Sequence, residues 1–335
     1  MLKNYQDEVR VGLLGFGTVG QGLVQGINLQ INNISARIGA RLKIKSALVQ
    51  DTNKKRVVGG PELTTDARDI LDDPEIDIVV EAMGGEQPAY DYIKQALGQR
   101  KQVVTANKLL LAQHGPELKA LAHRNGKGLL YEASVLGGIP ILRTIQHGLC
   151  GDKVEEVKGI FNGTTNFILT RMVELGEDYP TALRLAQEAG YAEADPTMDV
   201  SGLDAACKLV ILCRECFDME FHLKDVTMSG IEHLDQRQIT LEKRQGRIPK
   251  MIACAKPQNG EIKVGVEWLP DTDLLSRVSG VQNALSLKTL LAGELFWSGP
   301  GAGGLATGGA VLGDIMEAAE RVLMERDRAF QQTGK

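Results

Sequence analysis

The chain has 335 residues and a formal net charge of −5, and 38 of its residues are glycine. This length predicts about two domains, while the acidic charge excludes the basic stripe of nucleic-acid-binding proteins. A hydrophobic fraction of 43% with 11 prolines excludes a disordered linker. The N-terminal residues lack the apolar core of a signal peptide, and the longest uncharged stretch, residues 11–36, contains six glycines and is too polar for a transmembrane helix. We therefore expect a cytoplasmic protein without nucleic-acid or membrane partners.

Strand and helix patterns alternate over about the first 135 residues. Patterns of buried strands cover residues 9–14, 42–49, 76–83, 102–105 and 128–132. Helical patterns lie between them, at residues 21–38, 66–71, 87–97 and 109–124. Such alternation predicts right-handed βαβ units around a parallel sheet, and so an α/β fold.

The pattern changes in the second half of the chain. Helices are expected at residues 139–149, 166–175, 181–188 and 201–217, the last being the clearest. Strands are expected at residues 154–161, at 263–268, and at 285–297 with a short break. A final amphipathic helix at residues 305–330 must bury its apolar face, and we expect it to pack back on the first domain.

A glycine-rich turn joins the first strand to the first helix. It matches G-x-G-x-x-G, and its residues are Gly15, Phe16, Gly17, Thr18, Val19 and Gly20. In this setting the glycines permit a tight turn and close approach of a pyrophosphate to the helix N-terminus. The sequence therefore predicts a Rossmann-type dinucleotide-binding domain; an ordinary glycine-rich turn is the alternative.

The end of the second strand bears on cofactor choice. Asp51 would accept hydrogen bonds from a ribose 2′-hydroxyl and favour NAD, whereas the basic run 54–56 could neutralise a 2′-phosphate and favour NADP. Asp51 stands 31 residues beyond Gly20, further than the usual spacing of about 20. A longer first helix or an insertion would explain this distance, and the choice between NAD and NADP stays open.

Two charges interrupt the apolar helix pattern at residues 202–213. Asp204 and Lys208 are four residues apart, so they share one face of the helix. The apolar surroundings place the pair in the interior or in a cleft, where a lysine has a tunable pKa and can move a proton. The alternative is a buried ion pair that only joins two elements.

Further charges lie at loops beside these elements. The loop at residues 190–199 brings three carboxylates to the helix entrance, where Asp199 could serve only as a cap, although such a cluster also suits an amino-group ligand. Lys108 follows the carboxyl end of a strand, which is where ligands bind in open α/β sheets. A solvated surface lysine is the alternative there.

These motifs resemble those of the homoserine dehydrogenase family. The run from Ala186 to Lys208 fits the family signature A-x3-G-Y-A-x2-D-P-x2-D-V-x-G-x-D-x3-K without a departure. Further blocks resemble the family in order, at residues 81–85, 105–108, 131–135 and 159–169. The resemblance spans essentially the whole chain, and the long 186–208 motif is far more specific than the glycine fingerprint.

The resemblance implies a fold and a reaction. It implies a dinucleotide-binding domain at residues 1–138 plus 305–335, a dimerisation region at 139–150 plus 262–304, and a mixed α/β catalytic domain at 151–261. The implied reaction is the reversible reduction of L-aspartate 4-semialdehyde to L-homoserine with NADPH or NADH, in threonine and methionine biosynthesis. It also implies a homodimer or higher homo-oligomer, with an interface from residues 139–149 and 281–297.

The resemblance also implies roles for residues. Lys208 would donate and accept the proton at the substrate oxygen, with Lys108 nearby and Asp204 assisting. The implied substrate-binding residues are Glu193, Asp199, Asp204, Tyr191, Gly163 and Thr164. The implied cofactor contacts, besides the glycine turn and Asp51, are Met83, Gly84, Lys108 and Gly303.

A monovalent cation, usually sodium, is a further implication of the resemblance. The matching positions are Glu132, Val135, Gly137 and Ile139, which would act mostly through backbone carbonyls. A glycine-containing loop beside one glutamate is compatible with oxygen ligation, while a plain structural turn is the alternative.

The sequence differs from many family members in two features, and three other protein classes are alternatives to this family. Gln50 stands where many members have arginine, which weakens the case for NADP, and the chain stops at Lys335, which suggests a short form without the C-terminal regulatory domain. One rival is an aspartate or diaminopimelate dehydrogenase acting at a Cα–N bond. Another is an aspartate-semialdehyde dehydrogenase, for which Cys150 is the only candidate nucleophile. The third is a dinucleotide sensor that has lost its chemistry, whose expected mark is the loss of the Asp204–Lys208 pair.

Overall fold

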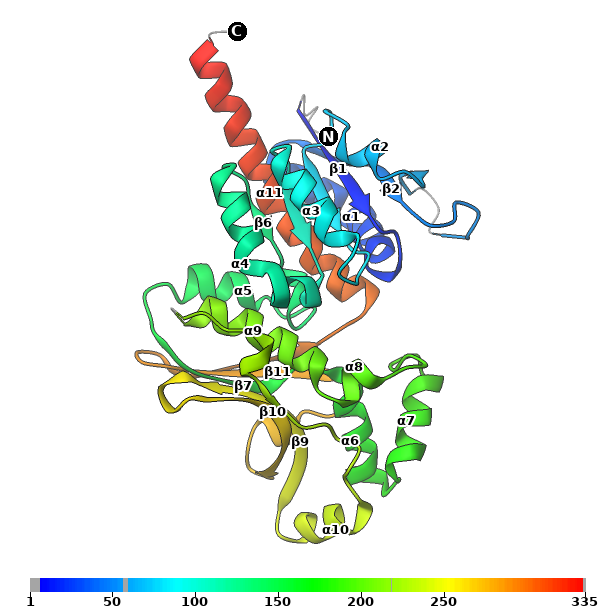
Figure 1. The fold of residues 1–335 in the computed structure, drawn as a ribbon, viewed down its shortest axis with the longest axis vertical. Helices are drawn as coiled ribbons and strands as arrows, with labels where there is room; N and C mark the ends of the chain where they lie inside the picture. The colour runs from blue at the N-terminus through cyan, green and yellow to red at the C-terminus, as the bar shows by residue number, and fades with distance from the viewer. Residues whose placement is uncertain (1–6, 57–59, 218, 334–335) are drawn as a thin grey trace. The chain divides into compact units, whose positions relative to one another are not determined.

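The chain folds into two compact units. The computed structural model describes residues 7–56, 60–217 and 219–333. Unit 1 comprises the residues up to Ser134 together with those from Gly303 onward, and unit 2 comprises Val135–Ala302. Figure 1 shows the elements of each unit, which we describe separately.

Unit 1 is built on a six-stranded parallel sheet. Its strands follow the order β3-β2-β1-β4-β5-β6, and each neighbouring pair is parallel. The strands are β1 (Glu8–Leu14), β2 (Arg41–Leu48), β3 (Glu62–Thr64), β4 (Ile78–Glu81), β5 (Gln102–Thr105) and β6 (Leu129–Leu130). The predicted parallel α/β sheet is confirmed. Its strand order is that of a dinucleotide-binding fold, in which successive strands are added on one side of β1 and then, from β4 onward, on its other side.

Four helices connect these strands: α1 (Thr18–Ile38), α2 (Arg68–Leu71), α3 (Ala89–Gly98) and α4 (Lys108–Arg124). A fifth helix of unit 1, α11 (Gly304–Thr333), is the last element of the described chain. The length of α1, 21 residues, explains the long interval between the glycine turn and Asp51. The strand expected at 128–132 ends sooner, because Glu132–Ser134 form a 3₁₀ turn, η1. The short β3, which was not predicted, pairs with β2 at the sheet edge.

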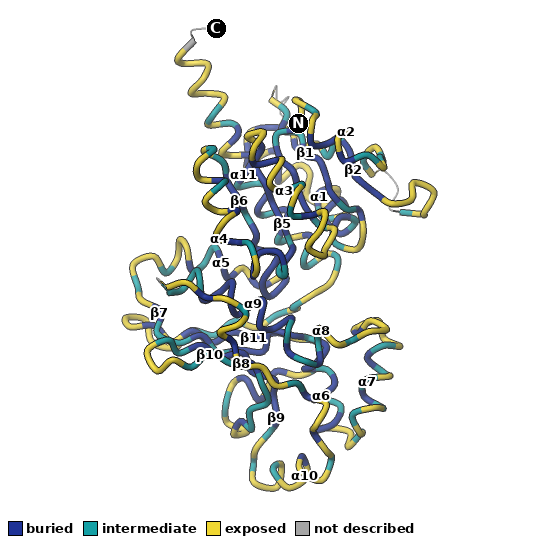
Figure 2. The backbone as a smooth tube through the Cα atoms, in the orientation of Figure 1, coloured by how far each residue is buried: buried dark blue, intermediate teal, exposed yellow. Residues whose placement is uncertain are grey.

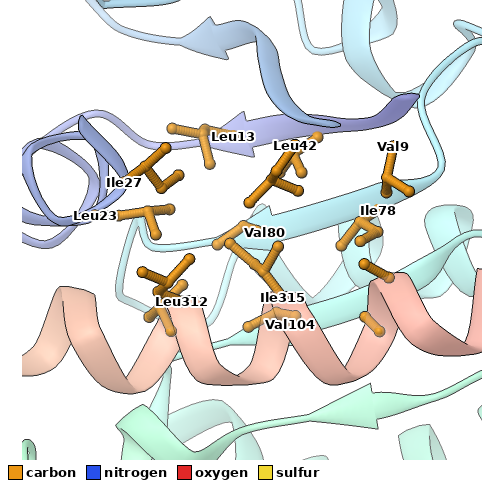
Figure 3. Close-up of a cluster of buried hydrophobic side chains, with 14 of the residues drawn as sticks. Val9, Leu13, Leu23, Ile27, Leu42, Ile78, Val80, Val104, Leu312 and Ile315 are labelled. Carbon is orange, nitrogen blue, oxygen red and sulfur yellow. The ribbon is translucent and has the colours of Figure 1, made fainter. Parts of the chain in front are cut away.

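The core of unit 1 lies between the sheet, α1 and α11. Figure 3 shows side chains of β1 and β4 pointing toward those of the two helices, among them Leu23 of α1 and Ile315 of α11. Apolar residues from Val311 to Val322 on α11 are buried in this cluster. The expectation that the final helix packs on the first domain is therefore confirmed, and burial of this apolar stripe stabilises the return of the chain to unit 1.

Small residues allow α1 and α11 to approach closely. A Cβ atom on Gly22 would lie 1.9 Å from the carbonyl oxygen of Gly304, and one on Gly308 would lie 2.5 Å from the amide nitrogen of Leu23. Neither contact leaves room for a side chain, because the opposing atoms belong to backbone. The sequence pattern predicted both helices but not this crossing.

The crossing gives a stability prediction. Gly22→Ala is expected to lower the free energy of unfolding by about 1–3 kcal/mol, the usual cost of forcing an extra methyl group into a packed contact. Gly26→Ala is the matched control on the same helix, because a Cβ there meets nothing closer than 4.0 Å; it should be neutral or stabilising by up to about 1 kcal/mol. Denaturant midpoints of both variants measure the difference, and equal midpoints would contradict the close crossing.

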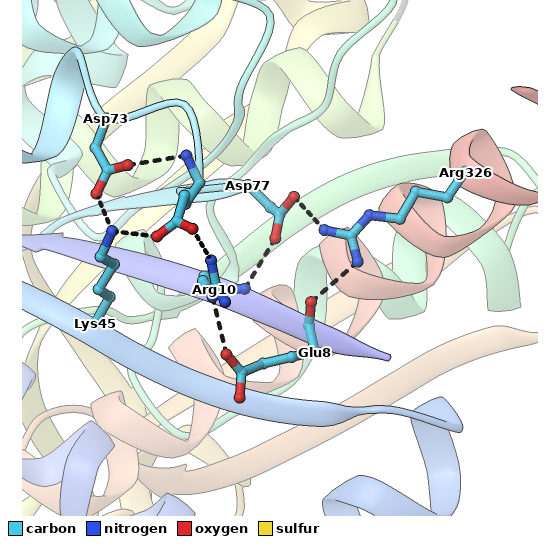
Figure 4. Close-up of polar contacts among 7 residues, drawn as sticks. Glu8, Arg10, Lys45, Asp73, Asp77 and Arg326 are labelled. Carbon is cyan, nitrogen blue, oxygen red and sulfur yellow. Dashed lines mark hydrogen bonds and ion pairs between the residues drawn. The ribbon is translucent and has the colours of Figure 1, made fainter. Parts of the chain in front are cut away.

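A network of ion pairs crosses the amino-terminal end of this sheet (Figure 4). Arg10 pairs with Glu8 at 2.9 Å and with Glu75 at 2.7 Å. From α11, Arg326 donates to Asp77 Oδ1 at 2.6 Å and to the carbonyl oxygen of Glu8 at 3.0 Å. These side chains are partly exposed, so solvent screens each pair and its contribution to stability is small. The network orients the helix end, while apolar burial supplies most of the stability.

Unit 2 contains a second six-stranded sheet, in the order β12-β11-β7-β9-β10-β8. Its strands are β7 (Val154–Ile160), β8 (Thr227–Met228), β9 (Arg247–Lys256), β10 (Glu261–Pro270), β11 (Gln282–Thr289) and β12 (Gly293–Pro300). Only the β10–β8 pair is parallel. The break expected within the strands at 285–297 is the turn at residues 290–292, which joins β11 and β12 in an antiparallel hairpin.

The helices of unit 2 are α5 (Ile141–Arg143), α6 (Gly163–Leu175), α7 (Tyr179–Glu188), α8 (Thr197–Val200), α9 (Leu203–Cys216) and α10 (Gln236–Arg244). Of these, α6, α9 and α10 pack against strands of the sheet, and α7 packs against α6. The helix expected at 139–149 is two short pieces, α5 and a π-helical turn at Thr144–Gly148. In Figure 2, β9 is mostly buried and α10 mostly exposed. Within residues 7–56, 60–217 and 219–333, no helix is both long and apolar enough to cross a membrane.

Candidate active site

The predicted glycine turn lies at the carboxyl ends of β1 and β4 in unit 1. Gly15 has φ +102°, a left-handed conformation that strains any other residue. A Cβ atom there would also lie 2.7 Å from the carbonyl oxygen of Ala82. Gly17 is the N-cap of α1, and no side chain caps this helix. The arrangement leaves a helix N-terminus at the topological switch point, where a dinucleotide phosphate binds in this architecture.

The loop that carries Met83 and Gly84 is shaped by Glu81, which sequence reasoning missed. Glu81 is fully buried at the end of β4. Its Oε1 accepts hydrogen bonds from the amides of Met83 (2.8 Å) and Gly84 (3.2 Å), and its Oε2 accepts from the Thr105 hydroxyl at 2.6 Å. A buried carboxylate thus fixes the loop after β4 against β5.

Lys108 is the first residue of α4, directly after this edge of the sheet. The preceding Asn107 caps the helix by accepting from the amide of Leu110 at 3.2 Å, and its Nδ2 donates to the carbonyl oxygen of Gly85 at 2.6 Å. Lys108 is half-buried. The structure therefore places Lys108 at the carboxyl end of the sheet, where the glycine turn also lies, as the sequence predicted from its position after a strand.

Asp51 follows β2 and is exposed, and its Oδ1 accepts from the amide of Asn53 at 2.8 Å. The amide of Gly15 donates to the carbonyl oxygen of Leu48 at 3.2 Å, which joins the end of β2 to the glycine turn. Lys54 and Lys55 are exposed beyond it, and residues 57–59 lie outside the described part of the chain. Both candidate readers of the ribose thus stand at the same end of the sheet.

In unit 2, the paired charges of α9 are buried. Lys208 Nζ lies 2.7 Å from Asp204 Oδ2, and the residues are only 8% and 2% exposed. Lys208 Nζ also donates to the carbonyl oxygen of Phe161 at 2.7 Å, at the end of β7. This confirms that the pair lies inside the protein, where a charge must be compensated by a partner.

A third side chain completes this cluster. Nδ2 of Asn162 donates to Asp204 Oδ2 at 2.9 Å and to Asp199 Oδ1 at 2.7 Å. The interpretation of Asp199 as a helix cap is wrong: the N-cap of α9 is Gly202, without a side-chain cap, and Asp199 lies within α8. A second carboxylate of this loop, Asp195, accepts through its Oδ1 from the amide of Thr197 at 3.1 Å and from its hydroxyl at 2.6 Å.

The environment of Asp199 shifts its titration. Burial and the charge of Asp204 raise the pKa of Asp199, and the hydrogen bond from Asn162, the charge of Lys208 and the hydrogen bond of Thr164 oppose this rise. A carboxyl whose folded pKa is raised contributes stability below its unfolded pKa and loses it as the pH rises through its folded pKa. Asp199 therefore destabilises the fold at neutral pH relative to acid.

This sign gives a prediction for Asp199→Asn. The substitution should raise the melting temperature at neutral pH and leave it nearly unchanged below the unfolded pKa of an aspartate, because it removes a desolvated charge beside Asp204. Asp195→Asn is the control, because hydrogen bonds from Thr197 lower the pKa of Asp195. Removing this carboxylate should therefore lower the melting temperature at neutral pH. Melting curves at acid and neutral pH would contradict the account if Asp199→Asn destabilised the protein at neutral pH.

The remaining predicted substrate residues lie in α6 and in the loop before α8. The Thr164 hydroxyl donates to the carbonyl oxygen of Tyr191 at 2.7 Å, and the Tyr191 ring contacts Phe167 with centroids 5.0 Å apart. Gly163 begins α6, where a Cβ atom would lie 2.7 Å from the carbonyl oxygen of Val281. Glu193 is exposed in the loop before α8. Thr164 is thus joined to Tyr191, while Glu193 lies in the exposed loop between Tyr191 and α8.

The predicted cation positions lie in and after the 3₁₀ turn η1. Glu132 in unit 1 is buried, and its amide donates to Asp314 Oδ2 at 2.8 Å, so a second buried carboxylate accompanies it. In unit 2, Val135 and Ile139 are buried, and a Cβ atom on Gly137 would lie 2.4 Å from the carbonyl oxygen of Gly301. Among the described residues, no three histidine, cysteine or acidic side chains gather as a metal site.

Gly303, the last predicted cofactor residue, precedes α11 in unit 1. It has φ +120° and is exposed. Its carbonyl oxygen accepts from the amide of Thr307 at 2.9 Å. The glycine permits the turn from which α11 begins.

Comparisons with known proteins agree over nearly the whole chain. A family model described as homoserine dehydrogenase, NAD binding domain, matches residues 15–132, and one described as homoserine dehydrogenase matches residues 140–316. A homoserine dehydrogenase of Bacillus subtilis is 45% identical, over 92% of this chain and 72% of the relative.

Solved structures show the same likeness. A homoserine dehydrogenase from Thiobacillus denitrificans is 37% identical, with a TM-score of 0.91 over 94% of this chain and 74% of that chain. A hyperthermophilic archaeal homoserine dehydrogenase, solved in complex with NADPH, is 27% identical, with a TM-score of 0.80 over 94% of this chain and 98% of that chain.

Proposed function

This chain belongs to the homoserine dehydrogenase family, and we propose that it catalyses the reversible reduction of L-aspartate 4-semialdehyde to L-homoserine with NADPH or NADH. The family is one of oxidoreductases with an NAD-binding domain. The observation that carries the proposal is the buried Lys208–Asp204 pair, joined by Asn162 to Asp199. A fold that had kept only cofactor binding would have no need of this charge cluster.

Lys208 is the proposed acid and base at the substrate oxygen. When bound, the nicotinamide supplies or accepts the hydride. In the reducing direction the substrate oxygen gains a negative charge, and the ammonium group of Lys208 stabilises that charge and donates a proton to it. In the oxidising direction Lys208 takes the proton from the hydroxyl group. Asp204 holds the lysine side chain in place at 2.7 Å.

The amino group of the substrate is assigned to carboxylates of unit 2. Asp199 stands beside the Lys208–Asp204 pair, and Glu193 lies in the adjoining loop. A substrate ammonium group would offset the repulsion between Asp199 and Asp204, because opposite charges favour each other most where burial lowers the dielectric constant. Tyr191, Thr164 and Gly163 would complete this pocket.

Unit 1 is assigned the cofactor. The residues fit such a group, because the left-handed turn at Gly15 and the N-terminus of α1 without a side-chain cap offer backbone amides to a pyrophosphate. Asp51 favours NAD, and the basic residues after it favour NADP; one structural relative was solved with NADPH. Lys108 at the start of α4 is the second lysine of the proposal.

The proposal also includes a monovalent cation and a homo-oligomer. Val135, Gly137 and Ile139 follow Glu132 along the chain, and their backbone carbonyls would be the oxygen ligands that hard cations prefer. For the oligomer, support comes from β12, an edge strand of the unit 2 sheet that carries the half-buried apolar residues Leu295, Phe296 and Trp297. Such an edge is suited to pairing with a second copy.

An activity assay tests the proposal. Purified protein should reduce NAD or NADP in the presence of L-homoserine, faster at alkaline pH because the oxidation releases a proton, and the reduced nicotinamide is followed by its absorbance. The same assay with L-aspartate and with meso-diaminopimelate provides the comparison with dehydrogenases that act at a Cα–N bond. Turnover of either of these with none of L-homoserine would contradict the proposal.

A further inference from the structure

We propose that Asn162 is a positioning residue for this reaction, whose side-chain amide joins Asp199 to Asp204 and so holds Asp204 against Lys208. The inference rests on the proposed function and extends it to a residue outside the signature run at 186–208. It concerns the turn between β7 and α6, within unit 2.

The amide of Asn162 is shared between two carboxylates. Its Nδ2 lies 2.7 Å from Asp199 Oδ1 and 2.9 Å from Asp204 Oδ2. The same Oδ2 of Asp204 accepts from Lys208 Nζ at 2.7 Å. The two N–H groups of one amide therefore satisfy two acids, and one of these acids is the partner of the proposed proton donor.

The orientation of this amide is fixed from the other side. Its Oδ1 accepts a hydrogen bond from the amide of Thr165 at 2.8 Å and caps α6, and the residue is only 5% exposed. Because the oxygen is committed to the helix, the nitrogen must face the carboxylates. A residue that served only as a cap would need only this oxygen, so the contacts of the nitrogen call for a second role.

The neighbouring residue supports the lysine in the same way. The carbonyl oxygen of Phe161 accepts from Lys208 Nζ at 2.7 Å and from Asn283 Nδ2 at 3.1 Å. Asn283 is fully buried on β11. The turn at residues 161–162 thus contacts both members of the charge pair, through a backbone oxygen for Lys208 and through a side-chain amide for Asp204.

The amide also separates two like charges. Asp199 and Asp204 repel each other, since the charge of Asp204 raises the pKa of Asp199 and the hydrogen bond from Asn162 lowers it. Without a donor between them, the two carboxylates have no common partner to hold them in place. We expect Asp204 then to leave its position on Lys208, so that the lysine is no longer aligned for proton transfer.

Asn162→Ser separates the two roles of this side chain. Serine caps helices as well as asparagine does, but its hydroxyl cannot cap α6 and also reach two carboxylates. The expected result is a fall of about 10- to 100-fold in kcat for L-homoserine oxidation, the range for loss of a hydrogen bond to a charged group. The KM for L-homoserine should rise because Asp199 is also released, while the KM for the cofactor stays the same.

Two further variants keep the test sharp. Asn162→Thr also retains a capping oxygen and suits the extended backbone at φ −130°, ψ 119°, so it takes the place of the serine variant if that variant does not fold. Asp235→Ala is the matched control: it removes the cap of α10 in the same unit, where Asp235 accepts from the amide of Gln238 at 2.8 Å. It should lower the melting temperature and leave kcat unchanged. A folded Asn162→Ser protein with kcat within about twofold of wild type would overturn the proposal.

A crystal structure of the Asn162→Ser protein separates this inference from the proposed function. An inactive wild-type protein would refute the function, whereas the structure tests positioning without turnover. We expect the Asp204 carboxylate to have moved away from Lys208 Nζ. Unchanged positions of Asp199, Asp204 and Lys208 would overturn the inference, even in an enzyme that oxidises homoserine.

Discussion

Lys208→Ala is expected to lower kcat for homoserine oxidation by about 10²- to 10⁴-fold, the usual range for loss of an acid–base group. Cofactor binding should persist, because the glycine turn and Asp51 belong to unit 1. The reason lies in the position of Lys208 Nζ, 2.7 Å from Asp204 and 2.7 Å from the Phe161 carbonyl oxygen. Steady-state kinetics with homoserine, together with titration of cofactor fluorescence, measure the two effects separately.

A second buried lysine provides the control for this variant. Lys250 on β9 donates to the carbonyl oxygen of Val278 at 2.5 Å, and burial lowers the pKa of Lys250 to about 8. Lys250→Met removes a buried lysine outside the carboxylate cluster, so it should leave kcat unchanged. If Lys208→Ala turned over at a near-normal rate, Lys208 would be a structural partner of Asp204 and nothing more.

Asp204→Asn is expected to destabilise the protein by about 3–5 kcal/mol, because it leaves the buried charge of Lys208 without its counter-ion. The substitution preserves the volume of the side chain, so packing is not the cause. The same change should lower kcat, since Lys208 loses the partner that orients it. Chemical denaturation and steady-state kinetics measure the two losses.

The double variant Asp204→Asn/Lys208→Met distinguishes charge from packing. Replacing both members of a buried ion pair is often neutral or stabilising, whereas breaking the pair is not. The double variant should therefore recover most of the stability lost in Asp204→Asn and remain inactive. Stability of the single variant equal to that of wild type would mean that the pair is not buried as a charged unit.

Much of unit 1 could be predicted from the sequence because its local signals agree. The strands predicted at residues 9–14, 42–49, 76–83 and 102–105 alternate with helical patterns, so period and order together predict parallel pairing. The strand order, the close contact of Gly22 with Gly304 and the buried Glu81 depend on contacts between distant segments. No local pattern contains that information.

Unit 2 was harder to predict. The long strand β9 begins Arg247-Ile-Pro-Lys250, and the charges and proline conceal a strand that the fold places between β7 and β10. Helix α10 has a polar sequence with a single buried residue, Ile239, so its apolar pattern is weak. Tertiary packing determines both elements, and neither was predicted.

The candidate site also contains residues that local sequence patterns predicted and residues that they did not. Spacing alone placed Asp204 and Lys208 on one face of a helix, and their apolar neighbours indicated burial. Spacing could not identify Asn162 as part of this site, because it lies 37 residues from Asp199 and 42 residues from Asp204. In the sequence it has the pattern of an ordinary helix cap. For Asp199 the sequence left a helix cap open as the alternative to ligand binding, because a carboxylate before a helix usually caps it. In the structure the side chain of Asp199 accepts from Asn162 Nδ2 instead.

The most direct test of the account follows one hydrogen atom. L-homoserine labelled with deuterium on the carbon that bears the hydroxyl group is incubated with the protein and oxidised cofactor, and the reduced cofactor is analysed by mass spectrometry and NMR. With the wild-type protein we expect deuterium at C4 of the nicotinamide. With Lys208→Ala the transfer rate should be lower by a factor of at least about 10². Reduced cofactor that carries no deuterium would contradict this prediction, because its hydride would then have come from a position other than the labelled carbon.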